Sequence, residues 1–405
     1  MPVPFISVVI PTRNRGHLVQ YALQSALNQA FDDYEIIVSD NCSQDNTASV
    51  VREIGAGRVR YVQPEQVLSM PDHWEFALDQ ARGRFIVYLC DDDAWAPGVL
   101  ERVSSLLDES TSKLVVLNSG VYYGHNWLDH ESRNVASFGP YTGEVREYDG
   151  SETIRRLYAS CHIVYDAPRM LNSFCHRDTL MRVRNITGRI FLLCPDYSFP
   201  SFMLTEIPSW LYIDEPLHLQ GVFAEGIGSA SVFNRGEPLR EFVREFDDGK
   251  VLRRVPLQAP VVSNYIAETL LMCKEKLPAK LGGFELDWSQ YFINCWADII
   301  RHEANGVNVE LDKQEFYAVV AGQPAIVRST VGKVLAETAR PLVKRSIRKL
   351  INSSSMLTNL ESRVRQRSDR HKDAPLTVTG AAAGFNNILE CAQQLPALAQ
   401  RSAVA

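Results

Sequence analysis

The chain has 405 residues, of which 45% are hydrophobic and 22% are charged, and its net charge at pH 7 is −6. This composition is that of a globular protein with two or three domains and argues against a disordered chain or a nucleic-acid binder. The eight cysteines form no C-x-x-C pair and no zinc-like spacing, so we expect free thiols in a reducing compartment. We expect neither a signal peptide nor a transmembrane helix, because the apolar runs are short.

The first eighty residues alternate short β-branched runs with amphipathic stretches. The pattern predicts strands at 5–10, 34–39 and 58–62, and helices at about 17–30, up to about 54, and at about 73–82. Alternation of this kind predicts a parallel sheet with right-handed crossovers.

The most informative stretch is the apolar run 84–90, which leads directly into Asp91, Asp92 and Asp93. Such a run is typical of a strand buried on both faces, and open α/β sheets bind their ligands at the carboxyl ends of strands. Three adjacent carboxylates repel one another, so they favour a hard divalent cation such as Mg²⁺ or Mn²⁺ among them. The alternative is a solvated acidic turn that caps the helix beginning near Pro97.

The second part of the chain has a weaker pattern. After a helix to about 107 and a strand at 113–118, aromatic residues become frequent and the elements become short. We expect helices at 173–183 and 197–204, a strand at 210–213, and a glycine-containing loop at 221–236. This loop is either a mobile lid or a plain surface loop.

Beyond about residue 240 the pattern is helical and then basic. Between Arg328 and Lys372 there are twelve Lys or Arg residues and three acidic residues. An apolar stripe from Val331 to Ile351 runs beside these charges. The two hypotheses are a basic amphipathic helix that lies on an anionic membrane surface and a helix that packs on its own protein. The last thirty or so residues are expected to be weakly ordered.

Four motifs in this order resemble those of glycosyltransferase family 2, a family with the GT-A fold. They are the first strand, its turn Pro11-Thr12-Arg13-Asn14, the turn that begins at Asp40, and the acidic triplet. The resemblance extends over about residues 5–220. It implies an α/β fold with a Rossmann-like, mostly parallel sheet flanked by helices, followed by a mainly helical C-terminal region.

With this resemblance the chain divides into four parts. Residues 1–110 are the nucleotide-sugar-binding half of the GT-A domain and residues 111–240 the acceptor-binding half. Residues 241–330 are a helical region, and residues 331–405 are the basic amphipathic helix with a weakly ordered tail.

The resemblance also implies the reaction, which is metal-dependent transfer of a sugar, with inversion, from a nucleoside diphosphate to a hydroxyl of a glycan or lipid-linked glycan. We expect Mn²⁺ or Mg²⁺ as the cation and cell-surface polysaccharide synthesis as the process. An ionised carboxylate such as Asp40 only accepts hydrogen bonds, so it suits the imide N–H of UDP, with dTDP or GDP as alternatives. We expect a cytoplasmic enzyme at the inner face of the membrane, touching anionic lipid through the basic helix.

Site residues are assigned only where the motifs match. The nucleotide-binding positions are Pro11, Thr12, Arg13, Asn14, Asp40 and Asp91. The metal-binding positions are Asp92, Asp93 and His218. Asp196 is the general base that accepts the proton of the attacking hydroxyl.

Three of these assignments have structural alternatives. Asp196 follows a proline and is also placed to cap a helix, and a lone histidine such as His218 is more often structural. Asp40 and Asp45 could both merely cap the following helix, and we expect the nucleotide role for Asp40 and the capping role for Asp45. The chain departs from the family pattern at Cys90, where an aspartate is usual, and at Arg13, where an aromatic residue is usual. Arg82 or basic residues of the loop 221–236 are candidates to assist the leaving group.

Two other functions fit parts of the pattern. A nucleotidyltransferase also combines a parallel sheet with acidic metal ligands, but it would need a glycine-rich phosphate loop after the first strand, where this chain has only Gly16. A sugar-nucleotide-binding or scaffold protein could keep the fold without turnover, although the intact Asp92 and Asp196 argue against this reading.

Overall fold

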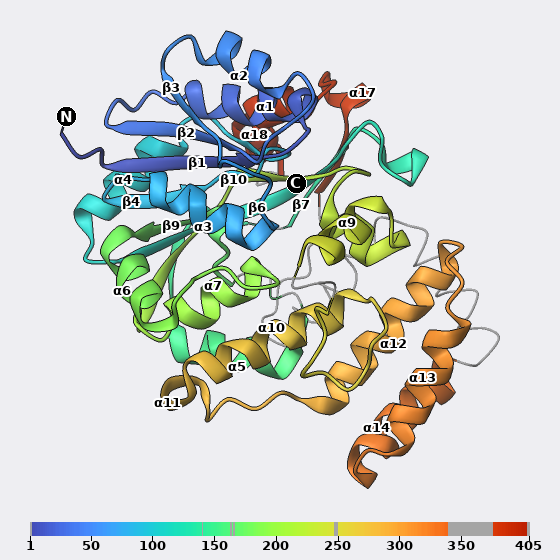
Figure 1. Ribbon diagram of the computed structural model, residues 1–405. Helices are drawn as coiled ribbons and strands as arrows, with labels where there is room; N and C mark the ends of the chain where they lie inside the picture. Colours follow the sequence, from blue (N-terminus) through green and yellow to red (C-terminus); the bar gives the residue numbers. More distant parts are fainter. Residues whose placement is uncertain are drawn as a thin grey trace.

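An eleven-stranded sheet forms the centre of the computed structural model, with helices on both of its faces (Figure 1). The structure describes residues 2–139, 141–162, 164, 167–246, 250–338 and 376–402. The strand order is β11-β7-β6-β9-β4-β1-β2-β3, and β10 pairs with β5, β6 and β8. The α/β fold with a helical C-terminal region is therefore confirmed.

The first half of the sheet is parallel. The chain runs through β1 (Ile6–Thr12), α1 (Gly16–Leu27), β2 (Tyr34–Asp40), α2 (Thr47–Gly55), β3 (Val59–Val62), α3 (Met70–Gln80) and β4 (Phe85–Tyr88). Strand β1 is buried along its whole length and pairs in parallel with β2 and β4. Burial on both faces explains the continuous β-branched runs in the sequence. The element order predicted here is confirmed.

The second half of the sheet is largely antiparallel, so the sheet as a whole is mixed rather than mostly parallel. Its elements are β5 (Ala94–Trp95), α4 (Val99–Glu109), β6 (Leu114–Tyr123), η1 (His130–Ser132), β7 (Val135–Phe138), β8 (Val145–Asp149), α5 (Gly150–Ser160), η2 (Met170–Asn172), β9 (Ser173–His176), α6 (Arg177–Thr187), α7 (Pro195–Met203) and β10 (Ser209–Val222). The helix predicted at 173–183 thus begins as a strand, because β9 fills the gap between β4 and β6.

Half of the segment expected to be a glycine-containing loop at 221–236 is helical. It contains α8 (Ile227–Ser229) and the π-helix η3 (Ala230–Asn234), and α9 (Glu237–Glu245) follows. Arg235 ends η3 and fixes it to the C-terminal region, where its Nε donates to His302 Nδ1 at 3.0 Å and its Nη2 pairs with Asp312 at 2.9 Å.

The C-terminal helices pack against elements of residues 111–240 and share one apolar core with them. They are α10 (Val262–Lys276), α11 (Pro278–Leu281), α12 (Trp288–Ala304), α13 (Glu310–Ala321) and α14 (Ala325–Thr338). Tyr158 of α5 is buried and donates to the Leu270 carbonyl of α10 at 3.0 Å. None of the helices that the structure describes is both long and apolar enough to cross a bilayer.

The end of the chain is not the weakly ordered tail that the sequence predicted. Residues 376–402 form β11 (Leu376–Thr379), α17 (Gly380–Ala383) and α18 (Ile388–Ser402). Strand β11 pairs antiparallel with β7, and α18 lies beside α1 and β10 (Figure 1). Phe385 is fully buried in this contact. The basic amphipathic helix falls largely within 339–375, outside the described residues.

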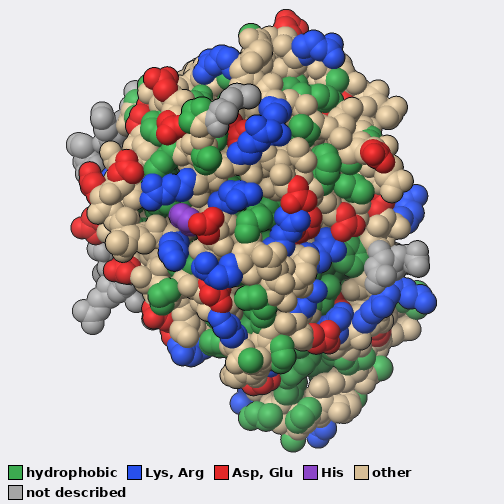
Figure 2. Space-filling view, turned by 60° about the vertical axis from the view of Figure 1, so that its left-hand side comes forward, with side chains coloured by type: hydrophobic (Ala, Val, Ile, Leu, Met, Phe, Trp, Pro, Cys, Tyr) green, Lys and Arg blue, Asp and Glu red, His purple; other side chains and the backbone are tan. Residues whose placement is uncertain are grey.

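Charged side chains of both signs are interspersed on one face of the molecule, whose net charge is −6. Lys and Arg side chains are frequent on the face shown in Figure 2, where the acidic side chains are scattered among them. Net charge alone therefore does not describe the potential that a charged ligand meets at a given face.

Candidate active site

The carboxyl ends of β1, β2 and β4 meet at one edge of the sheet. The parallel register places Thr12 beside Asp40, and Val9 beside Tyr88, which is the last residue of β4. The three predicted motifs follow these strand ends, so the fold brings them together, as expected for an open α/β sheet. Arg82, by contrast, precedes β4 and donates its backbone N–H to Glu35 at 2.8 Å, at the opposite edge, so it is too far away to assist a leaving group.

Arg15 neutralises part of the acidic triplet. Its Nη1 donates to Asp91 Oδ1 at 2.9 Å and to Asp92 Oδ2 at 3.2 Å, and its Nη2 donates to the Glu225 carbonyl at 2.8 Å. Thr12 Oγ1 donates to Asp91 Oδ2 at 2.8 Å. Burial lowers a guanidinium pKa, but the two carboxylates outweigh burial and raise the pKa of Arg15. Arg15 belongs to none of the motifs that predicted the site.

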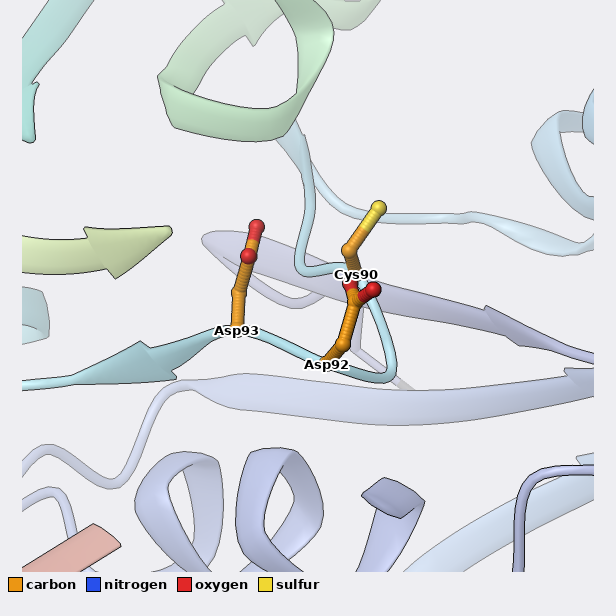
Figure 3. Close-up of side chains that lie close together, drawn as sticks. All are labelled: Cys90, Asp92 and Asp93. Carbon is orange, nitrogen blue, oxygen red and sulfur yellow. The ribbon is translucent and has the colours of Figure 1, made fainter. Parts of the chain in front are cut away.

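Asp92 and Asp93 lie with Cys90 in a group whose ligand atoms are all within 4.8 Å of one another. Figure 3 shows the three side chains on the turn that follows β4. Burial raises the pKa of Asp92 to about 8, and Asp91 and Asp93 add to this effect against the opposing charge of Arg15. A bound divalent cation would relieve this repulsion, so the site fits a hard cation. Burial and the neighbouring carboxylates also raise the pKa of the Cys90 thiol.

Asp93 is held in place by β10. His218 Nε2 lies 3.1 Å from Asp93 Oδ2, and the Gly221 backbone N–H donates to Asp93 Oδ1 at 2.8 Å. The other His218 ring nitrogen, Nδ1, lies 2.8 Å from Ser119 Oγ, and His218 is 1% exposed. Both ring nitrogens therefore have protein partners. His218 orients a proposed metal ligand, and its own binding to the metal stays a prediction.

Gly221 brings β10 into contact with the triplet. A Cβ atom at this position would lie 1.8 Å from the Asp92 carbonyl oxygen, so no other residue fits without moving the turn. The residue belongs to the glycine-containing segment noted in the sequence, but its partner was not foreseeable, because it is 129 residues away along the chain.

Asp40 is completely buried, and both of its carboxylate oxygens have protein partners. Oδ1 accepts from the Ser43 N–H at 3.0 Å and from Ser43 Oγ at 2.5 Å, and Oδ2 accepts from Gln63 Nε2 at 3.0 Å and from Tyr61 OH. A base edge that binds Asp40 has to replace one of these donors. The role of Asp40 in nucleotide binding stays a prediction.

The turn after β1 and the turn after β2 are tied together. The Gln44 N–H donates to Asn14 Oδ1 at 2.7 Å, and the Gly16 N–H donates to Asp45 Oδ2 at 2.9 Å. Asp45 also accepts from the Thr47 N–H at 3.0 Å in the first turn of α2. Partial burial of Asp45 is outweighed by these bonds, which lower its pKa. Asp45 thus bonds the first turn of α2, as predicted, but from the position before the N-cap residue, which is Asn46.

Arg13 reaches away from the triplet. Its Nη1 donates to Glu245 Oε1 of α9 at 2.7 Å, and both side chains are about one-third exposed. Arg13 therefore connects the predicted nucleoside turn to the helix that follows η3. Stacking of its guanidinium on a base would require this ion pair to open.

Asp196 differs from these paired acids. It lies in the first turn of α7, whose N-cap is Cys194 with no side-chain cap, so the alternative role as an N-cap is not what the structure shows. Among the described residues, its buried Oδ1 has no hydrogen-bond partner. Burial raises the pKa of Asp196, and Asp93 adds to this rise while Arg169 opposes it. A carboxylate with a raised pKa and a free oxygen is equipped to accept a proton.

Comparisons with known proteins agree with these motifs. The family model "Glycosyl transferase family 2" matches residues 7–178. The GalNAc(5)-diNAcBac-PP-undecaprenol beta-1,3-glucosyltransferase of Campylobacter jejuni is 38% identical over 110 residues, which are 26% of this chain and 36% of the relative. The UDP-Glc:alpha-D-GlcNAc-diphosphoundecaprenol beta-1,3-glucosyltransferase WfgD of Escherichia coli is 32% identical over 108 residues, which are 26% of this chain and 43% of the relative.

The matched part thus spans less than half the length of these two curated relatives. Among solved structures, S. aureus TarS 1-349 in complex with UDP-GlcNAc is 17% identical, with a TM-score of 0.45 over 80% of this chain and 88% of that chain.

Proposed function

We propose that this chain, which belongs to glycosyltransferase family 2, transfers a sugar from a nucleoside diphosphate to a hydroxyl of a glycan or lipid-linked glycan. The observation that carries the proposal is the unpaired, buried oxygen of Asp196, whose charge acts on both Asp93 and Cys90 of the acidic turn. The names of two relatives, which act on diphosphoundecaprenol-linked sugars, support a lipid-linked acceptor in polysaccharide synthesis.

The donor nucleotide lies, in this proposal, over the turn Pro11–Asn14, with its base at Asp40. Asp40 accepts from neutral donors, Gln63 among them, so an imide N–H can take the place of one. This chemistry favours UDP, with dTDP or GDP as alternatives. Cytosine presents an acceptor at the same ring position and is disfavoured.

Asp92 and Asp93 would hold a divalent cation, Mn²⁺ or Mg²⁺, which when bound neutralises charge on the departing nucleoside diphosphate. Arg15 fixes Asp92, and His218 with the Gly221 N–H fixes Asp93. Ligands that are already oriented lose little entropy when the donor binds.

Asp196 acts as the general base. It takes the proton of the acceptor hydroxyl as that oxygen forms a bond to the anomeric carbon, while the bond from that carbon to the phosphate oxygen breaks on the opposite side. The anomeric configuration is inverted, and the nucleoside diphosphate leaves with the electron pair. A positioned base of this kind contributes about 10²–10⁴-fold to the rate.

The site of action would be the inner face of the membrane. A lipid-linked acceptor is held there, and the basic sequence between Arg328 and Lys372 would attract anionic lipid. Each Lys or Arg near such a surface contributes about 1 kcal/mol.

Titration calorimetry tests the donor site. The purified protein is titrated with UDP, dTDP, GDP and CDP, with Mn²⁺ and with EDTA. We expect metal-dependent binding of one imide-bearing nucleotide, weakened at least about tenfold in Asp92→Ala. Asp108→Ala, on the exposed face of α4, is the matched control and is expected to bind as the wild type does. If the wild-type protein binds no nucleotide, the donor site is wrong and a scaffold role gains support.

A further inference from the structure

Among the residues that the structure describes, Arg169 is a partly buried charge without an acidic partner. Its Nε is buried and has no hydrogen-bond partner there, and its Nη1 donates to the neutral Gln220 Oε1 at 3.4 Å. Four other partly buried arginines are paired with carboxylates at 2.7–2.9 Å, namely Arg15 with Asp91, Arg235 with Asp312, Arg254 with Glu268 and Arg301 with Asp298.

The backbone at Arg169 is firmly fixed. Its N–H donates to Asn172 Oδ1 at 3.1 Å, and Asn172 Nδ2 donates to the Leu117 carbonyl of β6 at 3.0 Å. The next residue, Met170, is fully buried. The guanidinium is therefore carried by an anchored segment of the chain and not by a free loop.

Arg169 is placed near the active site by one hydrogen bond and one electrostatic interaction. Gln220, its partner, directly precedes Gly221, whose N–H binds Asp93 and whose Cα lies against the Asp92 carbonyl. On the other side, the charge of Arg169 acts on the unpaired Asp196. Arg169 is thus close to the part of β10 that contacts the acidic turn, and its charge reaches the proposed base.

We propose that Arg169 binds a substrate phosphate between these two groups. A guanidinium presents a planar fork of N–H donors that matches phosphate oxygens, and an unsatisfied N–H inside the site indicates a partner that arrives with the ligand. The ligand chemistry is a diphosphate. It is supplied either by the nucleoside diphosphate of the donor or by the lipid diphosphate of the acceptor, and this inference rests on the proposed function.

Binding to the full-length protein distinguishes the two sources. The probes are UDP and GDP with Mn²⁺ for the donor, and farnesyl diphosphate below its micellar concentration for the acceptor. We expect Arg169→Gln to weaken one of them by about ten- to hundredfold, and Arg169→Lys to restore part of the loss because it keeps the charge without the fork. Arg155→Gln, on the exposed face of α5, is the control.

Thermal unfolding separates a binding role from a structural one, and Arg169→Gln is expected to keep the wild-type Tm. Equal affinity of the wild type and Arg169→Gln for every probe overturns the inference and leaves the proposed function standing. Arg169-dependent binding of the lipid probe without any nucleotide binding supports the inference and overturns the proposed donor site. Failure of the wild type to bind any probe overturns both.

Discussion

The two sides of the candidate site differ in how their charges are paired. On the side that we propose binds the nucleotide, called the nucleotide side, Asp40, Asp91 and Arg15 all have protein partners within hydrogen-bonding distance. On the side that we propose binds the acceptor, called the acceptor side, and among the described residues, Asp196 has a buried oxygen without a partner and Arg169 has a buried nitrogen without one. In the free protein, Asp40, Asp91 and Arg15 therefore have their partners, whereas Asp196 and Arg169 each keep a buried atom that a substrate group can pair.

This difference in charge pairing affects the stability of the folded protein. A buried charge without a partner costs free energy in the folded state, and such costs are concentrated at functional sites. Paired charges instead support the fold that carries them. Removing a charge should therefore destabilise the protein on the nucleotide side, and it should leave stability unchanged or improved on the acceptor side.

The largest stability effect is expected for Arg15→Met, which removes the charge and keeps the length of the side chain. The change leaves Asp91 and Asp92 buried without the guanidinium that pairs with them. This loss lowers the free energy of unfolding by about 3–5 kcal/mol. Urea denaturation without divalent metal measures it. Arg102→Met breaks a more exposed pair with Glu215 and should cost about 1 kcal/mol or less. If Arg15→Met and Arg102→Met lost the same free energy of unfolding, the buried pairing of Arg15 would contribute no more to stability than an exposed ion pair does.

A smaller effect is expected from pH, through His73 on the nucleotide side. His73 is 4% exposed and bonds Ser39 Oγ at 2.9 Å, and its burial lowers its pKa to about 4, with Arg13 adding to the shift and Asp40 opposing it. The unfolded chain therefore binds more protons than the folded one between pH 6.5 and pH 4. Stability should fall as the pH falls through this range, by about 3 kcal/mol at pH 4.

Denaturation at a series of pH values checks this prediction. His73→Gln should flatten the curve between pH 6.5 and pH 4, whereas His130→Gln, at an exposed position of η1, should leave it unchanged. The same slope in wild type and His73→Gln would mean that other groups set the acid sensitivity of the fold.

The sequence predicted the elements of the first 90 residues well and those of the second half of the sheet poorly, for physical reasons. Strands β1 and β4 are buried along their whole length and β2 over most of it, so local periodicity and the residues at the strand ends were sufficient to place Asp40 and the triplet. The need for a positive charge near the triplet was also foreseeable, but it was assigned to a cation alone, whereas Arg15 meets part of it.

Other features depend on contacts between distant parts of the chain, which periodicity does not report. Gly221 matters because its Cα meets Asp92, and Arg169 matters because it lies near Gln220 and Asp196. The C-terminal segment has a weak local pattern, yet Phe385 is fully buried, and the segment is ordered by its pairing with β7. Such order arises from tertiary packing and overrides local propensity.

The smallest effect on stability and a large effect on kcat are expected together at Asp196. Measuring both tests whether this buried carboxylate is the general base. Asp196→Asn should unfold at the same or a higher denaturant concentration than the wild type, because it replaces a buried carboxylate that has no partner on one oxygen. Its kcat for sugar transfer should fall by about 10²–10⁴-fold while nucleotide affinity is kept. Wild-type turnover by Asp196→Asn would mean that Asp196 is not the general base. A loss of stability as large as that of Arg15→Met would mean that Asp196 supports the fold.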